Sequence, residues 1–181
     1  MVEPGSRRFV LPDFKAQIIF WSLLVAGLLF DLWTKSAVFA WLDGRPQGIS
    51  LIDGFLRFVA ALNDGAAFNI FASNTLFLIS ISGVAILLVL GLFLFGGSRH
   101  RLVHVALGCF AAGICGNLYD RAFNGGQVRD FINVYVRISG TEHHWPAFNV
   151  ADSMLCIGVG LLIISTVIAG QSDRKHAQQH K

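Results

Sequence analysis

The stretch Thr75-Leu-Phe-Leu-Ile-Ser-Ile-Ser-Gly-Val-Ala-Ile-Leu-Leu-Val-Leu-Gly-Leu-Phe-Leu-Phe95 runs for 21 residues without a charged side chain. A helix needs about 20 mostly apolar residues to cross the hydrocarbon core of a membrane, so this stretch predicts a transmembrane helix. Over the whole chain, 54% of the residues are hydrophobic and 14% are charged. An ordinary soluble domain has about 25% charged residues, so the composition favours a membrane protein over a soluble one.

Three further stretches have the same character. Residues 154–170 are uncharged, and residues 102–118 contain no Asp, Glu, Lys or Arg. Residues 16–30 are also uncharged, and this apolar run continues past Asp31 and Lys35 to Leu42. We therefore predict four transmembrane helices, at about 16–38, 75–95, 102–120 and 152–170. Residues 1–170 would form a single membrane-embedded domain, followed by a polar tail at 171–181.

The first apolar stretch could alternatively belong to a cleaved signal peptide, in which small residues follow the apolar region. Here the sequence Asp31-Leu-Trp-Thr-Lys35 follows instead, which is a poor context for cleavage. We therefore expect a retained helix.

Basic residues indicate the orientation of the chain in the membrane. Four spans place both termini, and the loop between the second and third spans, on one side. That side carries eight of the 14 Lys and Arg residues and three acidic residues, and its loop at 96–101 holds two Arg and no acid. Because Lys and Arg near span ends mark the cytoplasmic face, we expect both termini and the tail to be cytoplasmic. Topology then accounts for the net charge of +3, and we expect no nucleic-acid partner.

The cysteines and histidines do not predict a metal site. His100 and His104 are four residues apart, but Arg101 stands where a zinc protease motif carries its Glu. The three cysteines lie in predicted spans without metal-ligand spacing, which is typical of small buried hydrophobic residues: Cys109, Cys115 and Cys156. We expect neither a metal nor another cofactor.

Two segments outside the spans, at about 41–74 and 121–150, are too long to be plain turns. The first contains Ile49-Ser-Leu-Ile52 and Phe55-Leu-Arg-Phe-Val-Ala-Ala-Leu62, and the second contains Phe131-Ile-Asn-Val-Tyr-Val-Arg-Ile138. Runs of β-branched and aromatic residues between turn signals predict strands. Since both segments lie on the outer side, we expect a small sheet over the outer ends of the helices. The expected fold class is an all-α polytopic membrane protein with four transmembrane helices and this extracytoplasmic β-sheet.

Polar residues collect near the outer ends of the predicted helices. At a rise of about 1.5 Å per residue, Asp31 and Lys35 lie in the outer third of the first span. Six others lie at or just beyond the outer ends of the later spans: Asn117, Asp120, Arg121, Asp130, Asn149 and Asp152. Ionisable groups at membrane depth are energetically costly, so their presence indicates function.

These residues also have purely structural explanations. Asp31 and Lys35 are four residues apart on one helix face and could form an ion pair. Asp152 could cap the fourth helix, and Arg121 could extend to lipid headgroups. Chemistry alone leaves open which carboxylates react, and three remain candidates: Asp120, Asp130 and Asp152.

Five short strings narrow the choice, and they occur in this order: Asp31-Leu-Trp-Thr-Lys35, Asn63-Asp-Gly-Ala-Ala-Phe68, Gly116-Asn-Leu-Tyr-Asp-Arg121, Val128-Arg-Asp-Phe131 and Trp145-Pro-Ala-Phe-Asn-Val-Ala-Asp152. Together, on a four-span chain, they closely resemble the lipoprotein signal peptidases, also called signal peptidase II. The resemblance covers about 16–170. It implies an aspartyl protease of the bacterial cytoplasmic membrane. Such enzymes remove the signal peptide from prolipoproteins by cutting before a cysteine that carries a diacylglyceryl group.

The resemblance also implies roles for particular residues. Matched string by string, the catalytic pair falls on Asp130 and Asp152. Substrate-binding and supporting positions of the family fall on seven others: Asp31, Lys35, Asn63, Gly65, Asn117, Arg121 and Asn149. The implied partners are the lipidated prolipoprotein and membrane lipids. Residues 1–170 would then be a protease domain, acting as a monomer with its active site on the outer side of the inner membrane.

The chemistry expected of such a pair is acid–base catalysis. Two carboxylates that share a site cannot both ionise at low cost, so one retains a proton near neutral pH. The ionised one takes a proton from the attacking water, and the protonated one polarises the scissile carbonyl. Two features depart from the usual family pattern. The doubled Gly125-Gly126 lengthens the loop before Asp130, and Arg129 stands where an apolar residue is common, so we expect Arg129 to favour the ionised form of the pair.

Two other classes of function are weaker interpretations. A small ion-coupled carrier would also place carboxylates in the membrane, but it is expected to show broken helices or a repeated half, and this sequence shows neither. A serine mechanism at Ser153 lacks a Gly-x-Ser-x-Gly string.

Overall fold

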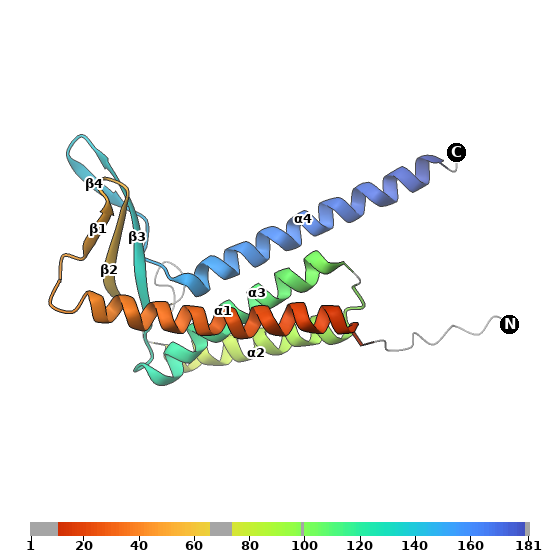
Figure 1. Ribbon diagram of the computed structural model, residues 1–181, viewed down its shortest axis with the longest axis horizontal. Helices are drawn as coiled ribbons and strands as arrows, with labels where there is room; N and C mark the ends of the chain where they lie inside the picture. The colour runs from red at the N-terminus through yellow and green to blue at the C-terminus, as the bar shows by residue number, and fades with distance from the viewer. Residues whose placement is uncertain (1–10, 66–73, 99, 180–181) are drawn as a thin grey trace.

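The computed structural model describes residues 11–65, 74–98 and 100–179. Four long helices dominate this part of the chain: α1 (Phe14–Trp41), α2 (Thr75–Phe95), α3 (Arg101–Phe123) and α4 (Val150–Gln179). All four are long and apolar enough to cross a membrane, and they contain the four predicted spans, which confirms the fold class (Figure 1). Helix α4 continues through Gln179, so the tail predicted from residue 171 begins as helix. The predicted features at 1–10 and 66–73, including the end of the Asn63–Phe68 string, lie outside the described residues.

Helix α3 is the centre of the bundle and packs against α1, α2 and α4. Small residues allow this close approach, because a side chain at these positions would collide with the neighbouring helices. A Cβ at Gly113 would lie 2.5 Å from the carbonyl oxygen of Ala151 in α4, and one at Gly108 would lie 3.1 Å from that of Phe20 in α1. Membrane helices commonly associate through such small residues, since lipid supplies no hydrophobic force between them.

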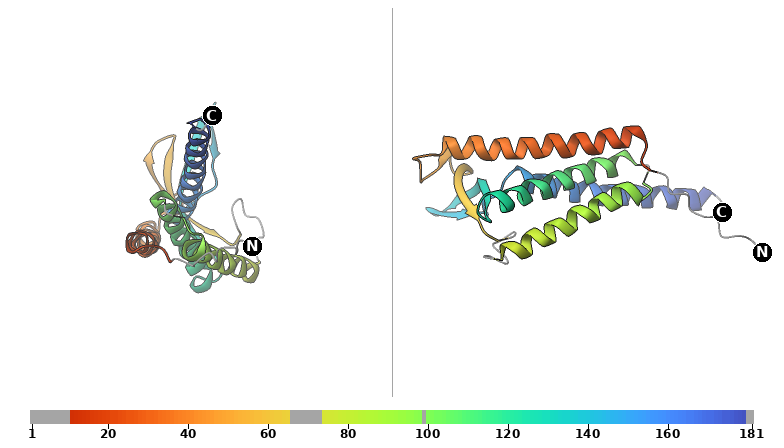
Figure 2. Two further views of the ribbon diagram at one scale, coloured as in Figure 1. Left: turned by 90° about the vertical axis from the view of Figure 1, so that its right-hand side faces the viewer. Right: turned by 90° about the horizontal axis from the view of Figure 1, so that it is seen from below.

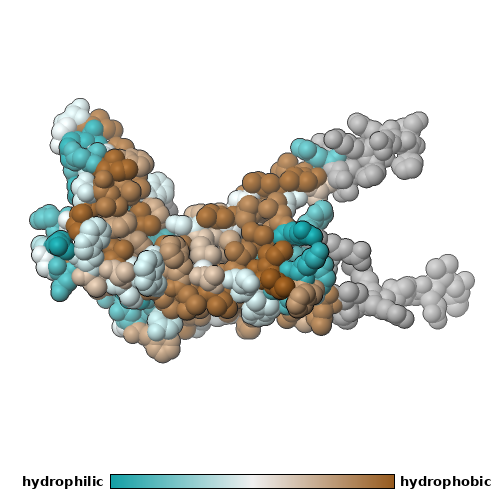
Figure 3. Space-filling model, viewed as in Figure 1, coloured by the Kyte–Doolittle hydropathy of each residue, from teal (hydrophilic) through white to brown (hydrophobic). Residues whose placement is uncertain are grey.

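The outer surfaces of α1, α2 and α4 expose many large apolar side chains, among them Leu88, Leu92 and Ile163. Apolar residues cover the length of the helices, and more hydrophilic residues gather toward the two ends of the molecule (Figure 3). A surface of this kind suits contact with lipid, since soluble proteins rarely expose apolar patches of that extent.

Four antiparallel strands form one sheet in the order β1-β2-β3-β4: β1 (Ile49–Ile52), β2 (Leu56–Asn63), β3 (Val128–Ile138) and β4 (Thr141–His144). The predicted sheet is confirmed, and both outer segments contribute to it. It lies at one end of the bundle, where α1 and α3 end and α2 and α4 begin (Figures 1 and 2). Strand β4 was not predicted. It pairs with β3 through a two-residue turn in which Ser139 and Gly140 both have positive φ, at 52° and 82°, as tight hairpins favour.

Candidate active site

Asp130 lies in β3 and is almost completely buried at 2% exposure. Both of its carboxylate oxygens accept hydrogen bonds from neutral amides. Asn63 Nδ2 of the adjacent strand β2 donates to Oδ2 at 2.9 Å, and Asn149 Nδ2 donates to Oδ1 at 2.6 Å. The antiparallel pairing of β2 with β3 brings Asn63 within reach, because Asn63 pairs with Val128 and Ala61 pairs with Asp130.

Asp152 lies in the first turn of α4. Its Oδ2 accepts the backbone N–H of Asn149 at 3.1 Å, while Asn149 Oδ1 accepts the backbone N–H of Asp152 at 3.0 Å. This reciprocal pair is a capping box, in which two side chains satisfy free N–H groups at a helix start. The second oxygen, Oδ1, accepts Asn117 Nδ2 from α3 at 2.7 Å. Asp152 therefore caps α4, which was one of the explanations offered for it from the sequence. Its second carboxylate oxygen remains available to bind Asn117.

Asn149 connects the two carboxylates, which we call the aspartate pair (Asp130 and Asp152). Its side chain is fully buried. The oxygen Oδ1 caps α4 beside Asp152, and the amide nitrogen donates both to Asp130 and to Asn117 Oδ1, the latter at 3.1 Å. Strand β3, helix α3 and the start of α4 thus meet at one asparagine.

The electrostatic setting of Asp130 favours retention of a proton. Removal from water, and secondly the nearby Asp152 carboxylate, raise the pKa of Asp130 from its ordinary value of 3.8 to about 6. Hydrogen bonds from Asn63 and Asn149 oppose this rise because they stabilise the charged form. Because Asp152 contributes to the raised pKa of Asp130, the two carboxylates interact electrostatically.

A cluster of buried ion pairs lies beside the aspartate pair. Lys35 Nζ lies 2.7 Å from Asp31 Oδ2 and 3.4 Å from Asp120 Oδ2, and all three side chains are fully buried. The Asp31–Lys35 ion pair expected from their spacing is therefore confirmed. Lys35 also donates to Asn117 Oδ1 at 3.1 Å, and Asp31 Oδ1 accepts the backbone N–H of Ala151 at 2.8 Å. These contacts tie α1 to both α3 and α4.

Arg121 turns into the protein and does not extend to lipid headgroups. Its side chain is 9% exposed, and its guanidinium donates to the carbonyl oxygen of Gly65 at 2.7 Å. Asn63 Oδ1 in turn accepts the backbone N–H of Gly65 at 3.0 Å. Arg121 therefore fixes the end of β2 close to the aspartate pair. Within the described part of the chain, its Nε has no hydrogen-bond partner.

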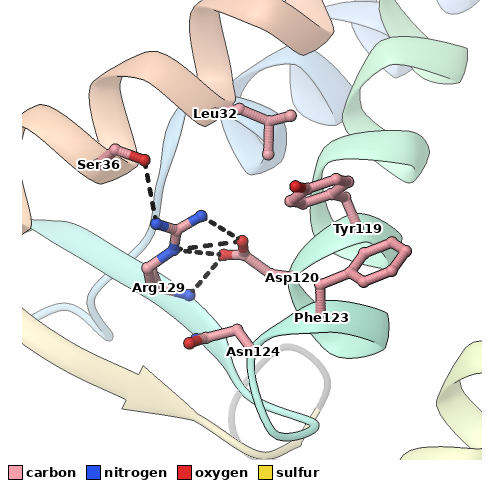
Figure 4. A pocket seen from close by; sticks show the side chains of 7 residues that line it. All are labelled: Leu32, Ser36, Tyr119, Asp120, Phe123, Asn124 and Arg129. Atoms are coloured by element: carbon pink, nitrogen blue, oxygen red, sulfur yellow. Dashed lines mark hydrogen bonds and ion pairs between the residues drawn. The ribbon is translucent and has the colours of Figure 1, made fainter.

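Arg129 was expected to favour the ionised form of the aspartate pair, and its direct partners are Asp120 and Ser36. Its Nη2 lies 2.6 Å from Asp120 Oδ1, its backbone N–H donates to Asp120 Oδ2 at 2.9 Å, and its Nη1 donates to Ser36 Oγ at 3.2 Å (Figure 4). Successive residues of a strand point to opposite faces, so Arg129 turns away from the face that carries Asp130. The pocket beside it, of about 280 Å³, lies between α1 and α3 and is lined by Arg129 and Asp120 but not by the aspartate pair.

These contacts separate the three aspartates that the sequence left as candidates. Asp120 has cations at both oxygens, Arg129 and Lys35. The partners found for Asp130 and Asp152 in the described residues are amides and a backbone N–H. A carboxylate neutralised by two cations is a poor proton carrier, whereas carboxylates in a neutral shell can exchange a proton near pH 7. No group of three His, Cys, Asp or Glu residues that could hold a metal occurs among the described residues.

The fold and this site together define a class: a multi-pass membrane enzyme of the aspartic peptidase type. Comparison with known proteins identifies the family. The family model described as signal peptidase (SPase) II matches residues 23–168. The chain is 35% identical over 162 residues to a lipoprotein signal peptidase of Rhodopirellula baltica, covering 82% of this chain and 71% of that protein. It is 36% identical over 155 residues to that of a Sulfurihydrogenibium species, covering 82% and 91%.

A solved bacterial membrane enzyme, determined by the in meso method at 2.3 Å resolution, has the same fold. It superimposes with a TM-score of 0.73 at 27% identity, over 90% of this chain and 93% of that one. The chain therefore belongs to the signal peptidase II family and is an enzyme of the aspartic peptidase class.

Proposed function

We propose that this protein removes the signal peptide from diacylglyceryl-modified prolipoproteins, cleaving before the lipidated cysteine, with Asp130 and Asp152 as the catalytic residues. The curated relatives are named lipoprotein signal peptidases, which supports this class of substrate. The observation that carries the assignment of residues is the aspartate pair itself: two carboxylates from different elements, joined through Asn149 in a shell of neutral donors.

The proposed reaction is hydrolysis of one peptide bond by water. The ionised member of the pair removes a proton from water as the water oxygen attacks the scissile carbonyl carbon. The protonated member donates a hydrogen bond to the carbonyl oxygen. As the C–N bond breaks, a proton passes to the nitrogen, which leaves as an amine, and the signal peptide is released as a carboxylic acid. Asp130, whose pKa is about 6, suits a shared-proton mechanism near neutral pH.

The supporting residues keep the pair in this geometry. Asn63 and Asn149 hold Asp130, and Asn117 holds Asp152. Arg121 and Gly65 anchor the end of β2, and Asp31 and Lys35 tie α1 to α3 and α4. The charges of Arg121 and Lys35 also act on the aspartate pair. This supporting role extends the assignment made from the resemblance.

We further propose that the site faces the outer side of the bacterial inner membrane, with both termini cytoplasmic. The aspartate pair lies where the helices meet the sheet, and α2 ends at Phe95 and α3 begins at Arg101 at the opposite end of the bundle. This location lets the acyl chains of the substrate remain in lipid while the peptide bond reaches water. The protein would act as a monomer in contact with membrane lipids and the prolipoprotein.

The test is cleavage of a diacylglyceryl-modified prolipoprotein by the purified protein in lipid–detergent micelles. Wild type, Asp130→Asn and Asp152→Asn are compared with Asp53→Asn, whose side chain is 79% exposed on the sheet. Wild type and Asp53→Asn are expected to cut before the lipidated cysteine, and the other two variants to be folded but inactive. Normal cleavage by Asp130→Asn or by Asp152→Asn would refute the assignment of these two residues as the catalytic pair. A folded wild type that binds the substrate but never cleaves it would favour a carrier instead.

A further inference from the structure

The ion pairs beside the active site form a closed, neutral unit, which we call the charge cluster (Asp31, Lys35, Asp120 and Arg129). It contains two carboxylates and two cations. Asp31, Lys35 and Asp120 are fully buried, and the Arg129 side chain is 19% exposed. Three of these residues coincide with the family resemblance, but Arg129 does not, and nothing so far assigns it a role in the reaction.

Lys35 contributes to the orientation of Asn117. An ammonium group only donates hydrogen bonds, so the side chain of Asn117 must turn its oxygen toward Lys35 Nζ, which lies 3.1 Å away. The amide nitrogen of Asn117 then faces Asp152 Oδ1, to which it donates at 2.7 Å. If Asn117 turned over, Asp152 would face an oxygen and would lose this donor. Asn117 Oδ1 also accepts Asn149 Nδ2 at 3.1 Å, so Lys35 and Asn149 together hold Asn117 in the orientation that donates to Asp152.

Asp120 competes for Lys35, and Arg129 limits that competition. Asp120 Oδ1 is taken by Arg129 Nη2 at 2.6 Å and Nε at 3.2 Å, and Oδ2 accepts the backbone N–H of Arg129 at 2.9 Å. Lys35 Nζ consequently stays at 3.4 Å from Asp120 but at 2.7 Å from Asp31. The bond from Arg129 to Ser36 of α1 holds the guanidinium in this place (Figure 4).

We propose that Arg129 is a positioning residue for the reaction, acting through Asp120, Lys35 and Asn117 on the orientation of Asp152. Without it, the buried Asp120 carboxylate keeps Lys35 as its only ion-pair partner in the described part of the chain. Lys35 is then drawn toward Asp120 and away from Asn117, whose oxygen loses one of the two donors that set its orientation. This proposal rests on the proposed function, because it concerns the same aspartate pair.

The experiment measures kcat and KM for the lipidated prolipoprotein with Arg129→Leu, Arg129→Gln and Arg129→Lys, together with melting curves. Arg137→Leu is the matched control, since Arg137 lies in the same strand but pairs at the surface with Asp53 and Glu142. Displacement of a reacting group by about 1 Å costs up to about 100-fold in rate, so Arg129→Leu and Arg129→Gln are expected to lower kcat about 10- to 100-fold. Their KM is expected to stay within about 3-fold of wild type, because Arg129 does not line the face that carries Asp130.

Arg129→Lys restores a cation beside Asp120 and is expected to recover most of the lost kcat. If Arg129→Leu does not fold, the comparison of Arg129→Gln with Arg129→Lys carries the test. The proposal would be overturned if folded Arg129→Leu or Arg129→Gln kept the wild-type kcat. It would also be overturned if these variants lost kcat and Arg129→Lys did not recover it. The proposed function is tested separately in the same assay, since it requires cleavage by wild type and its loss in Asp130→Asn.

Discussion

Replacement of Asp130 by Asn tests the electrostatic cost of the aspartate pair directly. Burial and the neighbouring Asp152 raise the pKa of Asp130 from 3.8 to about 6. The folded protein therefore binds this proton more tightly than the unfolded chain does, and between these two pH values only the folded state is protonated. Stability contributed by this group is complete below pH 3.8, falls as pH rises, and is lost above about pH 6.

The expected magnitude follows from the interval between the two pKa values. One pKa unit corresponds to about 1.4 kcal/mol, so the folded protein loses about 3 kcal/mol as Asp130 ionises. Asn cannot ionise, and it resembles the protonated carboxyl in placing one donor group against Asn63 or Asn149. The free energy of unfolding of Asp130→Asn, relative to wild type, is therefore expected to rise by about 2.4 kcal/mol between pH 4, where a part of the effect is already lost, and pH 7.5.

The assay is equilibrium unfolding by sodium dodecyl sulfate in lipid–detergent micelles at a series of pH values, followed by tryptophan fluorescence. Asp53→Asn serves as the control, because its side chain is 79% exposed and solvent screens its ion pair with Arg137. Its difference from wild type should not vary with pH. A difference between Asp130→Asn and wild type that stays constant, or that shrinks as pH rises, would refute the raised pKa and the electrostatic argument built on it.

Two further substitutions test the surroundings of the pair. Asn63→Ala removes a hydrogen bond that stabilises the charged form of Asp130, so the pKa of Asp130 should rise further and the loss of stability in the same pH titration should end above about pH 6. An unchanged end point would contradict the role assigned to Asn63. Gly116→Ala would place a Cβ 2.4 Å from Asp31 Oδ2 and should lower the free energy of unfolding by about 1–3 kcal/mol. Gly91→Ala, which meets nothing within 4 Å, is the matched control, and an equal effect of the two would argue against crowding at Asp31.

The helices and most of the sheet could be predicted because their signals are local. Residues 75–95 coincide with α2, and 49–52 coincide with β1. Strand β4 could not be found in this way, since Thr141-Glu-His-His144 has no alternation of apolar and polar residues. It forms because the turn at Ser139 and Gly140 returns the chain alongside β3.

The sequence predicted the members of the candidate site but not the contacts between them. The sequence placed the polar residues at one depth, and the family resemblance selected Asp130 and Asp152. The sequence could not show that Asn149 connects Asp130 with Asp152, since these contacts depend on how α3, α4 and β3 pack together. The partner of Arg129 could not be predicted either. The period of two in a strand implies that Arg129 and Asp130 point to opposite faces, but only the packing of α3 beside β3 brings Asp120 to Arg129.

The separation of the charge cluster from the aspartate pair reconciles the packing of the helices with the proposed catalysis. A cation in direct contact with Asp130 would lower its pKa and remove the shared proton on which the proposed mechanism depends. Lys35 lowers the pKa of Asp130 less than either asparagine partner does, and its own hydrogen bond goes to Asn117 and not to Asp130. Cations are nevertheless needed at this depth, since they neutralise the buried carboxylates that hold α1 against α3 and α4. Amide groups resolve the conflict: they transmit orientation from the charge cluster to the aspartate pair without carrying its charge.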